Sequence, residues 1–273
     1  MPRLRPTRRA LLAAALAAAL PACAHRPVAG AAPCAWPASP EVLAQRADTV
    51  WQRWTLSADA LPTTWDATRD PAALPSLRHF RDTIAAAMGA TDARTLLQRQ
   101  IDWLGGRPDP TLRREAGNGR LVRDGTVGTL RPLGCLEALL LDGQAARFPM
   151  AGRPTELQAL LLVRPATGEA PARLRVYLAA SGAPWPPKLD PLLAHVARDR
   201  AEGWTVRAHL HNHPFYLEKR DADVAGANAP SLSDVQLYRW LRTSLGVEGA
   251  WVTNGFSTVE IPARDFDRLD AHR

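Results

Sequence analysis

The run from His209 to Pro214, His-Leu-His-Asn-His-Pro, constrains this chain more than any other part of its sequence. Side chains alternate along a strand, so two histidines one residue apart at its end point to the same side and can bind one ion. Further on, Pro-Ser-Leu-Ser-Asp, ending at Asp234, has the pattern of a helix start that would supply a carboxylate ligand. Three protein ligands would leave the fourth position of a tetrahedral zinc site open for water.

The pattern H-x-H-P followed by S-x-x-D resembles that of the JAMM (MPN-plus) zinc metallopeptidases. The resemblance extends over residues 119–273, which is within the usual size of one domain. It implies an α/β fold with a mixed, curved β-sheet flanked by helices, which is a JAMM/MPN-like and cytidine-deaminase-like architecture. It also implies one zinc ion per chain, held by His211, His213 and Asp234.

The order of the expected elements agrees with this resemblance. In the family, a helix leads into a strand that opens with the catalytic glutamate, and a second strand precedes the H-x-H strand. Glu156 opens an apolar run here, so the resemblance makes it the candidate general base. Apolar spacing and turn residues predict helices over 136–148 and 235–245 and strands over 155–163, 172–179 and 250–253.

The length of the loop after the histidines leaves the third ligand open. Residues 215–230 separate the two motifs, and this spacing is longer than the one usual in the family. Asp221 and Asp223 lie within the loop and are alternatives to Asp234. The Pro-Ser-x-x-Asp register favours Asp234.

Two other assignments also have alternatives. A pairing of His209 with His211 is possible, but the proline directly after His213 favours His211 and His213, and we interpret His209 as a neighbour of the site. Glu137 is an alternative to Glu156 as the catalytic carboxylate. It lies within a predicted helix, where an exposed carboxylate is ordinary.

The long loop Phe215–Ala229 is itself a candidate for function. Connections longer than about 12 to 15 residues without structure of their own are uncommon in compact domains, and those that occur often serve binding. We therefore predict that the loop lines or covers the cleft, with Phe215 or Tyr216 packing against the substrate. An inert surface insertion is the alternative.

The start of the chain predicts export. Residues 1–9 are basic and residues 10–20 form an apolar run too short to span a bilayer, so residues 1–23 resemble a signal peptide, with paired arginines like those of twin-arginine signals. Cys23 ends a bacterial lipobox-like sequence and is the predicted lipidation site, although Ala-Cys-Ala is also a site for ordinary secretory cleavage. We therefore expect a protein of the cell envelope or periplasm, anchored to a membrane through lipid.

Removal of the signal changes the charge of the chain. Four arginines leave with it, so the formal net charge falls from +7 to +3. No basic run interleaved with aromatic residues and no nucleic-acid module is present in the sequence, so we predict no nucleic-acid partner. Cys34 and Cys135 are the cysteines that remain, and whether they pair is left open.

The region before the metal motif predicts a linker and a small helical unit. Residues 24–40 are small and rich in proline, which is typical of a flexible tether. Residues 41–118 are expected to form a helical N-terminal region, in which the tryptophans belong to the core. Its expected helices cover 42–56, starting near Ser39-Pro40-Glu41, then 74–88 and 91–104.

The resemblance implies a hydrolase that cleaves an amide bond, peptide or isopeptide, with a zinc-activated water. Glu156 would take a proton from the water and pass it to the leaving amine, and Ser231 would donate a hydrogen bond to the oxyanion. Cross-linked or branched cell-wall peptides, or envelope proteins, are the expected substrates of an exported enzyme of this kind. The alternative is a catalytically inactive MPN-like scaffold or binding lipoprotein, but the full set of candidate ligands favours the enzyme.

Overall fold

A mixed β-sheet of eight strands, counted within the described residues, is the scaffold of the molecule. The computed structural model describes residues 32–57, 69–70, 73–89, 91–168, 170–217 and 226–271. The strands of the sheet are β2 (Glu41–Arg46), β3 (Thr49–Ser57), β5 (Thr129–Pro132), β6 (Leu157–Arg164), β7 (Arg173–Ala180), β8 (Thr205–Asn212), β9 (Gly249–Thr253) and β10 (Ser257–Pro262).

The strand order places β6 and β8 in the middle of this sheet. Neighbouring strands follow the order β2-β3-β7-β6-β8-β9-β10-β5. The pair β8 and β9 is parallel, and all other neighbours are antiparallel. The chain is therefore of the α/β class with a mixed sheet, which confirms the predicted class. A separate short pair, β1 (Ala32–Pro33) and β4 (Arg69–Asp70), is parallel.

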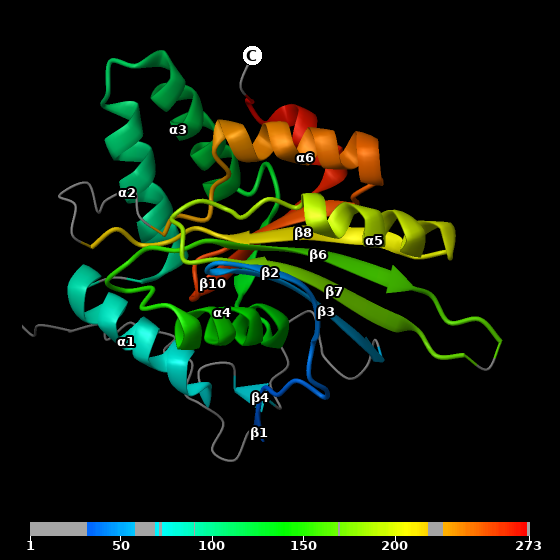
Figure 1. The fold of residues 1–273 in the computed structure, drawn as a ribbon. Coiled ribbons are helices and arrows are strands. Elements are labelled where there is room, and N and C mark those ends of the chain that lie inside the picture. Colours follow the sequence, from blue (N-terminus) through cyan, green and yellow to red (C-terminus); the bar gives the residue numbers. More distant parts are fainter. Residues whose placement is uncertain are drawn as a thin grey trace, which may run out of the picture.

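Helices cover both faces of the sheet (Figure 1). One face packs against α1 and α4, and the other against α5 and α6, while α2 and α3 pack against each other beside the end of the sheet that carries the histidines. The helices are α1 (Pro75–Met88), α2 (Ala93–Gly105), α3 (Pro110–Arg123), α4 (Cys135–Arg147), α5 (Asp190–Ala201) and α6 (Leu232–Leu245), and a 3-10 helix, η3 (Ala263–Arg268), follows β10.

Strand β6 shows why a central strand can have a run of mostly apolar residues that are all buried, here residues 157–162. Leu161 packs into the cluster formed with α1 and α4, whereas its neighbour Leu160 packs into the cluster formed with α5. Alternate side chains of a strand point to opposite faces, and here both faces are covered. Residues 157–162 of β6 therefore have no solvent-facing position, and burial of both faces stabilises the strand.

The prediction of a helix over residues 42–56 was wrong. These residues form β2 and β3, and β3 pairs with β7 from Val50↔Ala180 to Ser57↔Arg173. Val50 and Trp54 lie at a spacing that fits one face of a helix but also one face of a strand, and both point into the same core cluster. Long-range pairing with β7 therefore decided between two locally acceptable structures, and residues 41–57 belong to the main sheet.

The prediction of a flexible linker over 24–40 was wrong for its described part. Cys34 is buried and forms a disulfide with Cys135 at the start of α4, across a sequence separation of 101 residues. Trp36 stacks on Trp54 with ring centroids 4.3 Å apart. These contacts attach the segment to the core, and the disulfide answers the question of whether the two cysteines pair.

The predicted helices at 74–88 and 91–104 are confirmed as α1 and α2, and α3 and α5 were not anticipated. The Asp92 carboxylate caps α2 by accepting a hydrogen bond from the Thr95 N–H at 2.9 Å. Residues 1–23, including Cys23, lie outside the described residues. In the described part of the chain, no helix has the length and apolar character that crossing a membrane requires.

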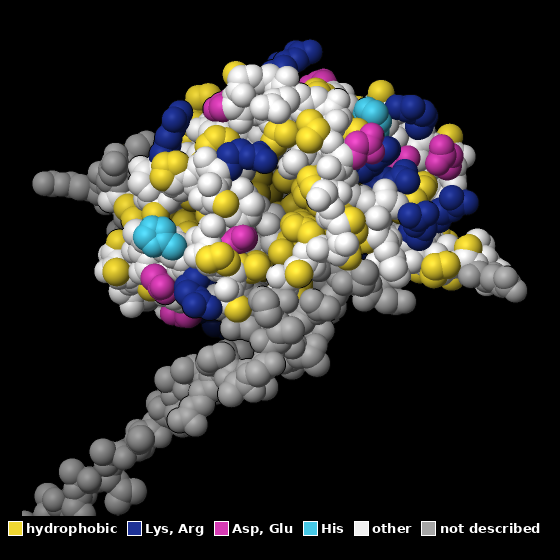
Figure 2. Space-filling model, turned by 60° about the horizontal axis from the view of Figure 1, so that its bottom comes forward, with side chains coloured by type: hydrophobic (Ala, Val, Ile, Leu, Met, Phe, Trp, Pro, Cys, Tyr) yellow, Lys and Arg dark blue, Asp and Glu magenta, His cyan; other side chains and the backbone are white. Residues whose placement is uncertain are grey.

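Figure 2 shows one face of the surface, with the region below the sheet brought forward. Basic and acidic side chains are interspersed on this face, and apolar side chains line a hollow near its centre.

Candidate metal centre

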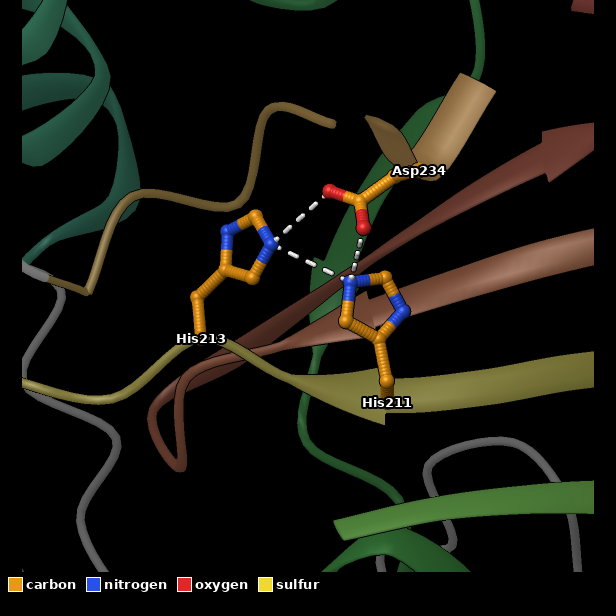
Figure 3. Close-up of side chains that lie close together, drawn as sticks. All are labelled: His211, His213 and Asp234. Carbon is orange, nitrogen blue, oxygen red and sulfur yellow. Dashed lines mark hydrogen bonds and ion pairs between the residues drawn. The ribbon is translucent and has the colours of Figure 1, made fainter. Parts of the chain in front are cut away.

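Two histidines at the end of β8 and an aspartate at the start of α6 converge on one point (Figure 3). His211 Nε2 lies 3.1 Å from His213 Nε2 and 3.5 Å from Asp234 Oδ1. His213 Nε2 lies 3.2 Å from Asp234 Oδ2. The three ligand atoms all lie within 4.8 Å of one another, so this largely buried group has the geometry to hold a metal ion.

The sheet determines where these residues meet. Strand β8 lies between β6 and β9, and its register with β9 ends at Asn212↔Thr253. The His213 N–H donates to the Thr253 carbonyl at 2.9 Å, so the backbone stays paired one residue beyond the strand. This pairing keeps His211 and His213 on a fixed part of the chain, whereas Asp234 comes from the first turn of α6.

A capping box holds the carboxylate in place. The Ser231 N–H and hydroxyl both donate to Asp234 Oδ2 at 2.8 Å, and Ser231 Oγ accepts from the Asp234 N–H at 3.1 Å. Burial opposes ionisation of Asp234, but its interactions with His211 and His213 outweigh this and hold its pKa well below its ordinary value. The aspartate is therefore an oriented anion.

A hydrogen bond of His213 Nδ1 orients the ring and so determines where Nε2 points. His213 Nδ1 lies 2.7 Å from the Ala227 carbonyl oxygen, which only an N–H can satisfy. Nε2 therefore faces the cluster, the arrangement found where histidines bind metals. Burial disfavours the charged ring, but Asp234 and Glu156 overcome this and raise the pKa of His213 to about 9. A metal cation would take the place of that proton.

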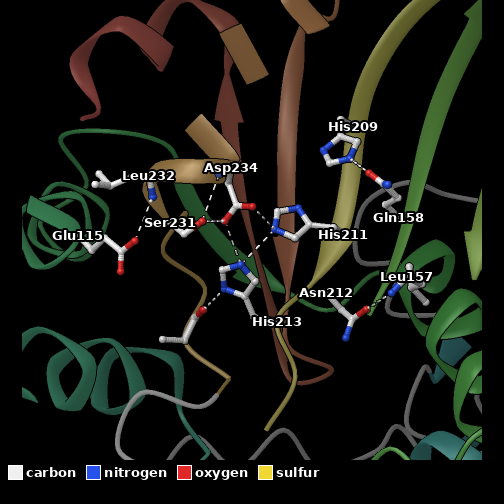
Figure 4. Close-up of polar contacts among 11 residues, drawn as sticks. Glu115, Leu157, Gln158, His209, His211, Asn212, His213, Ser231, Leu232 and Asp234 are labelled. Carbon is white, nitrogen blue, oxygen red and sulfur yellow. Dashed lines mark hydrogen bonds and ion pairs between the residues drawn. The ribbon is translucent and has the colours of Figure 1, made fainter. Parts of the chain in front are cut away.

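His209 lies next to this group and is not a member of it. Its Nε2 is 2.9 Å from Gln158 Oε1, and only 1% of the residue is exposed (Figure 4). Burial and the neighbouring His211 lower the pKa of His209 to about 3, so its ring is neutral. Asp221 and Asp223, the alternatives for the third ligand, lie outside the described residues.

Glu156 stands directly before β6, on the strand adjacent to β8. Its N–H donates to the Ala183 carbonyl at 3.0 Å. Burial raises the pKa of Glu156 to about 7, with His213 lowering it and Asp234 raising it. A carboxyl group with this pKa exchanges a proton near neutral pH, which is what a general base and acid requires.

Glu137, the alternative carboxylate, has a different environment from the one expected. It is fully buried rather than exposed, and it pairs with Arg131. Arg131 also pairs with Glu260 at 2.7 Å. This ion-pair cluster links α4 to β5 and β10, so the Glu137 carboxylate serves packing between these elements.

The expectation that Phe215 packs against substrate was wrong. Its ring is 0% exposed and contacts Phe80 of α1 and Phe256, with centroids 6.1 Å and 5.9 Å apart. Tyr216 is partly buried, and its hydroxyl donates to the Pro184 carbonyl at 3.3 Å. Residues 218–225 of the predicted substrate loop lie outside the described residues.

Two features of the site were missed in the sequence. The Asn212 side chain is bonded to the backbone on both sides of Glu156, at Thr155 and at Leu157. Figure 4 shows the bond to Leu157, and the sequence signal was a polar residue between the two histidines. The carbonyls of residues 183, 184 and 187 accept hydrogen bonds from Glu156, Tyr216 and Gln158. Within this segment Trp185 is 66% exposed, and its proline-rich sequence was the available signal.

Comparisons with protein-family models, with curated proteins and with solved structures find no match to this chain. The chemistry of the site must therefore be inferred from its own residues. The site consists of three convergent ligand side chains and, next to them, a carboxyl group with a raised pKa. Hydrogen bonds such as that between His213 Nδ1 and the Ala227 carbonyl orient the ligands.

Proposed function

We propose that this chain is a zinc-dependent peptidase or isopeptidase of the cell envelope, of the JAMM type. The observation that carries the proposal is the convergence of His211, His213 and Asp234 beside a carboxyl group whose pKa is about 7. Two imidazoles and one carboxylate are a donor set of catalytic zinc sites that keep an open position. Bound zinc would supply a water with a pKa lowered towards neutrality.

Glu156 is the proposed proton carrier of the reaction. Its carboxylate form accepts the proton of the attacking water, and its acid form returns that proton to the leaving amine. A pKa of about 7 keeps both forms populated near neutral pH. His213 and Asp234 act as ligands, and the capping box and the Ala227 carbonyl hold them in position.

Ser231 is proposed as the donor to the oxyanion, and the structure limits how this can occur. The Ser231 hydroxyl donates to Asp234 Oδ2 at 2.8 Å, so its single proton is already used. The hydroxyl would have to turn from Asp234 towards the oxyanion during the reaction. Ser231→Ala tests this, with an expected loss of about 100-fold in kcat if the hydroxyl stabilises the oxyanion.

Metal analysis of the purified mature protein is the first experiment. We expect one zinc ion per chain, and loss of zinc in His211→Ala, His213→Ala and Asp234→Ala. His209→Ala is the matched control, since that histidine is buried beside the group but bonds Gln158. Full zinc content in Asp234→Ala would contradict the proposed ligand set.

Turnover on a panel of linear peptides and branched peptides with a lysine ε-amide is the second experiment. Glu156→Gln should bind zinc normally and lose nearly all turnover, because the amide cannot carry the proton. Glu137→Gln is the control carboxylate and should retain kcat. Zinc without turnover on any amide would favour the scaffold or binding lipoprotein over the enzyme.

Export is the part of the proposal that concerns location. A disulfide between Cys34 and Cys135 supports it, because such bonds persist mainly in oxidising compartments. Mass analysis should find Cys23 as a lipid-modified first residue, and Cys23→Ser should release the protein from membranes. A mature chain that begins after Cys23 without lipid would instead indicate a secreted soluble protein.

A further inference from the structure

The side chain between the two histidine ligands is bonded to the residues on either side of Glu156. Asn212 Oδ1 accepts a hydrogen bond from the Leu157 N–H at 2.7 Å. Asn212 Nδ2 donates to the Thr155 carbonyl at 3.0 Å. The Asn212 side chain is buried, with 1% of the residue exposed, so these bonds are shielded from water.

The Asn212 side chain makes these bonds at the point where backbone pairing between β6 and β8 ends. The register between β6 and β8 begins at Gln158↔His211 and does not include residue 157. Beyond that pair the β8 backbone is paired with β9, up to Asn212↔Thr253. The Asn212 side-chain amide has one acceptor and one donor group, as a peptide unit has. It therefore continues the hydrogen bonding between β8 and β6 for one residue beyond the last backbone pair.

These bonds hold the backbone on both sides of Glu156. The Thr155 carbonyl and the Glu156 N–H belong to the peptide unit before the glutamate, and the Leu157 N–H belongs to the unit after it. All three are hydrogen-bonded, to Asn212, Ala183 and Asn212 respectively. Two fixed peptide planes leave the φ and ψ of the residue between them little freedom, so its Cβ direction is held as well.

We propose that Asn212 is a positioning residue that holds Glu156 at a fixed place relative to the metal ligands. This inference rests on the proposed function. Asn212 lies between His211 and His213 in the chain. One short stretch of backbone therefore carries two ligands and also the clamp, by which we mean the two Asn212 hydrogen bonds that hold the backbone around Glu156. Any movement of this stretch carries the ligands and the base together. A misplacement of about 1 Å at a reacting group can cost about 100-fold in rate.

Asn212→Leu is the informative variant, because it approximates the size of the side chain and removes both hydrogen bonds. We expect kcat on the best-cleaved peptide of the panel to fall by about 100-fold, with zinc content and KM near those of the parent. Asn212→Asp keeps the acceptor for the Leu157 N–H and should recover part of the rate. A kcat equal to that of the parent in Asn212→Leu would overturn the proposal.

Asn118→Leu is the matched control. Asn118 is also 1% exposed and also bridges two backbone groups, since it donates to the Asp270 carbonyl at 2.9 Å and accepts from the Asp270 N–H at 2.8 Å. It lies in α3, outside the metal centre. Its loss should lower stability to a similar degree and leave kcat unchanged. An equal loss of kcat in both variants would mean that destabilisation explains the effect of Asn212→Leu.

A double variant separates positioning from a general structural role. If Asn212 acts through Glu156, then Asn212→Leu in a Glu156→Gln background should cause little further loss of rate. A further loss near 100-fold would overturn the proposal, because the two effects would then be independent.

Amide hydrogen exchange tests the clamp without turnover. The Leu157 N–H should exchange faster in Asn212→Leu than in the parent and in Asn118→Leu. Unchanged exchange would refute the clamp whatever the activity is. If the parent turns over no peptide, the proposed function fails, while the exchange measurement still decides whether Asn212 holds this segment.

Discussion

Gly226 is the position where one added methyl group should disturb the metal centre most. Its φ is +69°, and an added Cβ would lie 2.2 Å from two atoms of the Phe215 ring. The ring cannot withdraw easily, since it is 0% exposed and packs between Phe80 and Phe256. Gly226→Ala therefore combines backbone strain with overpacking of the core.

The two effects can be given magnitudes. A non-glycine residue in the left-handed region costs about 1 to 2 kcal/mol, and overpacking of a core costs about 1 to 3 kcal/mol. Gly226→Ala should then lower the free energy of unfolding by about 2 to 5 kcal/mol. Metal affinity should fall too, because the next residue, Ala227, supplies the carbonyl that orients His213 at 2.7 Å.

Chemical denaturation with and without zinc is the assay, and Gly125→Ala is the control. Gly125 has φ +67° but no heavy atom within 4 Å of the added Cβ. In Gly125→Ala the free energy of unfolding should therefore fall only by the cost of backbone strain, about 1 to 2 kcal/mol. Phe215→Leu combined with Gly226→Ala should lose less stability than the two single variants together. Equal losses in Gly226→Ala and Gly125→Ala would refute the steric part of this reasoning.

Four further predictions concern charge and covalent structure. Glu137→Leu removes a partner of the largely buried Arg131 and should lower the free energy of unfolding by about 3 kcal/mol in denaturant titrations, with zinc content unchanged. In the metal-free protein, the raised pKa of His213, about 9 against an ordinary 6.5, stabilises the fold fully below pH 6.5. That stability is lost as pH rises through about 9, which denaturation at a series of pH values would show. Zinc binding near neutral pH should release a proton, which calorimetry in buffers of different ionisation enthalpy would detect; binding without proton release would contradict the raised pKa. Replacing Cys34 and Cys135 with serine opens a closed loop of about 100 residues and should cost about 4 kcal/mol, and an equally stable reduced protein would show that the disulfide contributes little.

The sequence alone determined the elements whose signals are local. Helices α1, α2, α4 and α6 and strands β6, β7 and β9 follow from apolar spacing bounded by proline, glycine and capping residues. The H-x-H and S-x-x-D motifs also predicted which ligand side chains would meet. Period-two alternation points His211 and His213 to one side by local geometry, whereas tertiary packing brings Asp234, in the first turn of α6, to them.

Only the tertiary structure decided features that depend on distant partners. Residues 42–56 fit a helix or two strands, and the pairing of β3 with β7 and of β2 with β3 made them strands. Phe215 follows the metal motif closely in the sequence, which suggested a substrate contact, yet its ring is buried in packing against Phe80 and Phe256. Local periodicity is ambiguous for short apolar segments, so burial against another element determines the outcome.

The environment of each carboxylate was likewise a tertiary property. Glu137 and Glu156 are the same residue type, but one pairs with Arg131 in the core and the other lies beside the histidines with a pKa of about 7. The side chain of Asn212 reaches Glu156's neighbours across a sequence distance of more than fifty residues. A pKa depends on the charges and the burial around a group, and strand pairing and helix packing bring both from remote parts of the chain.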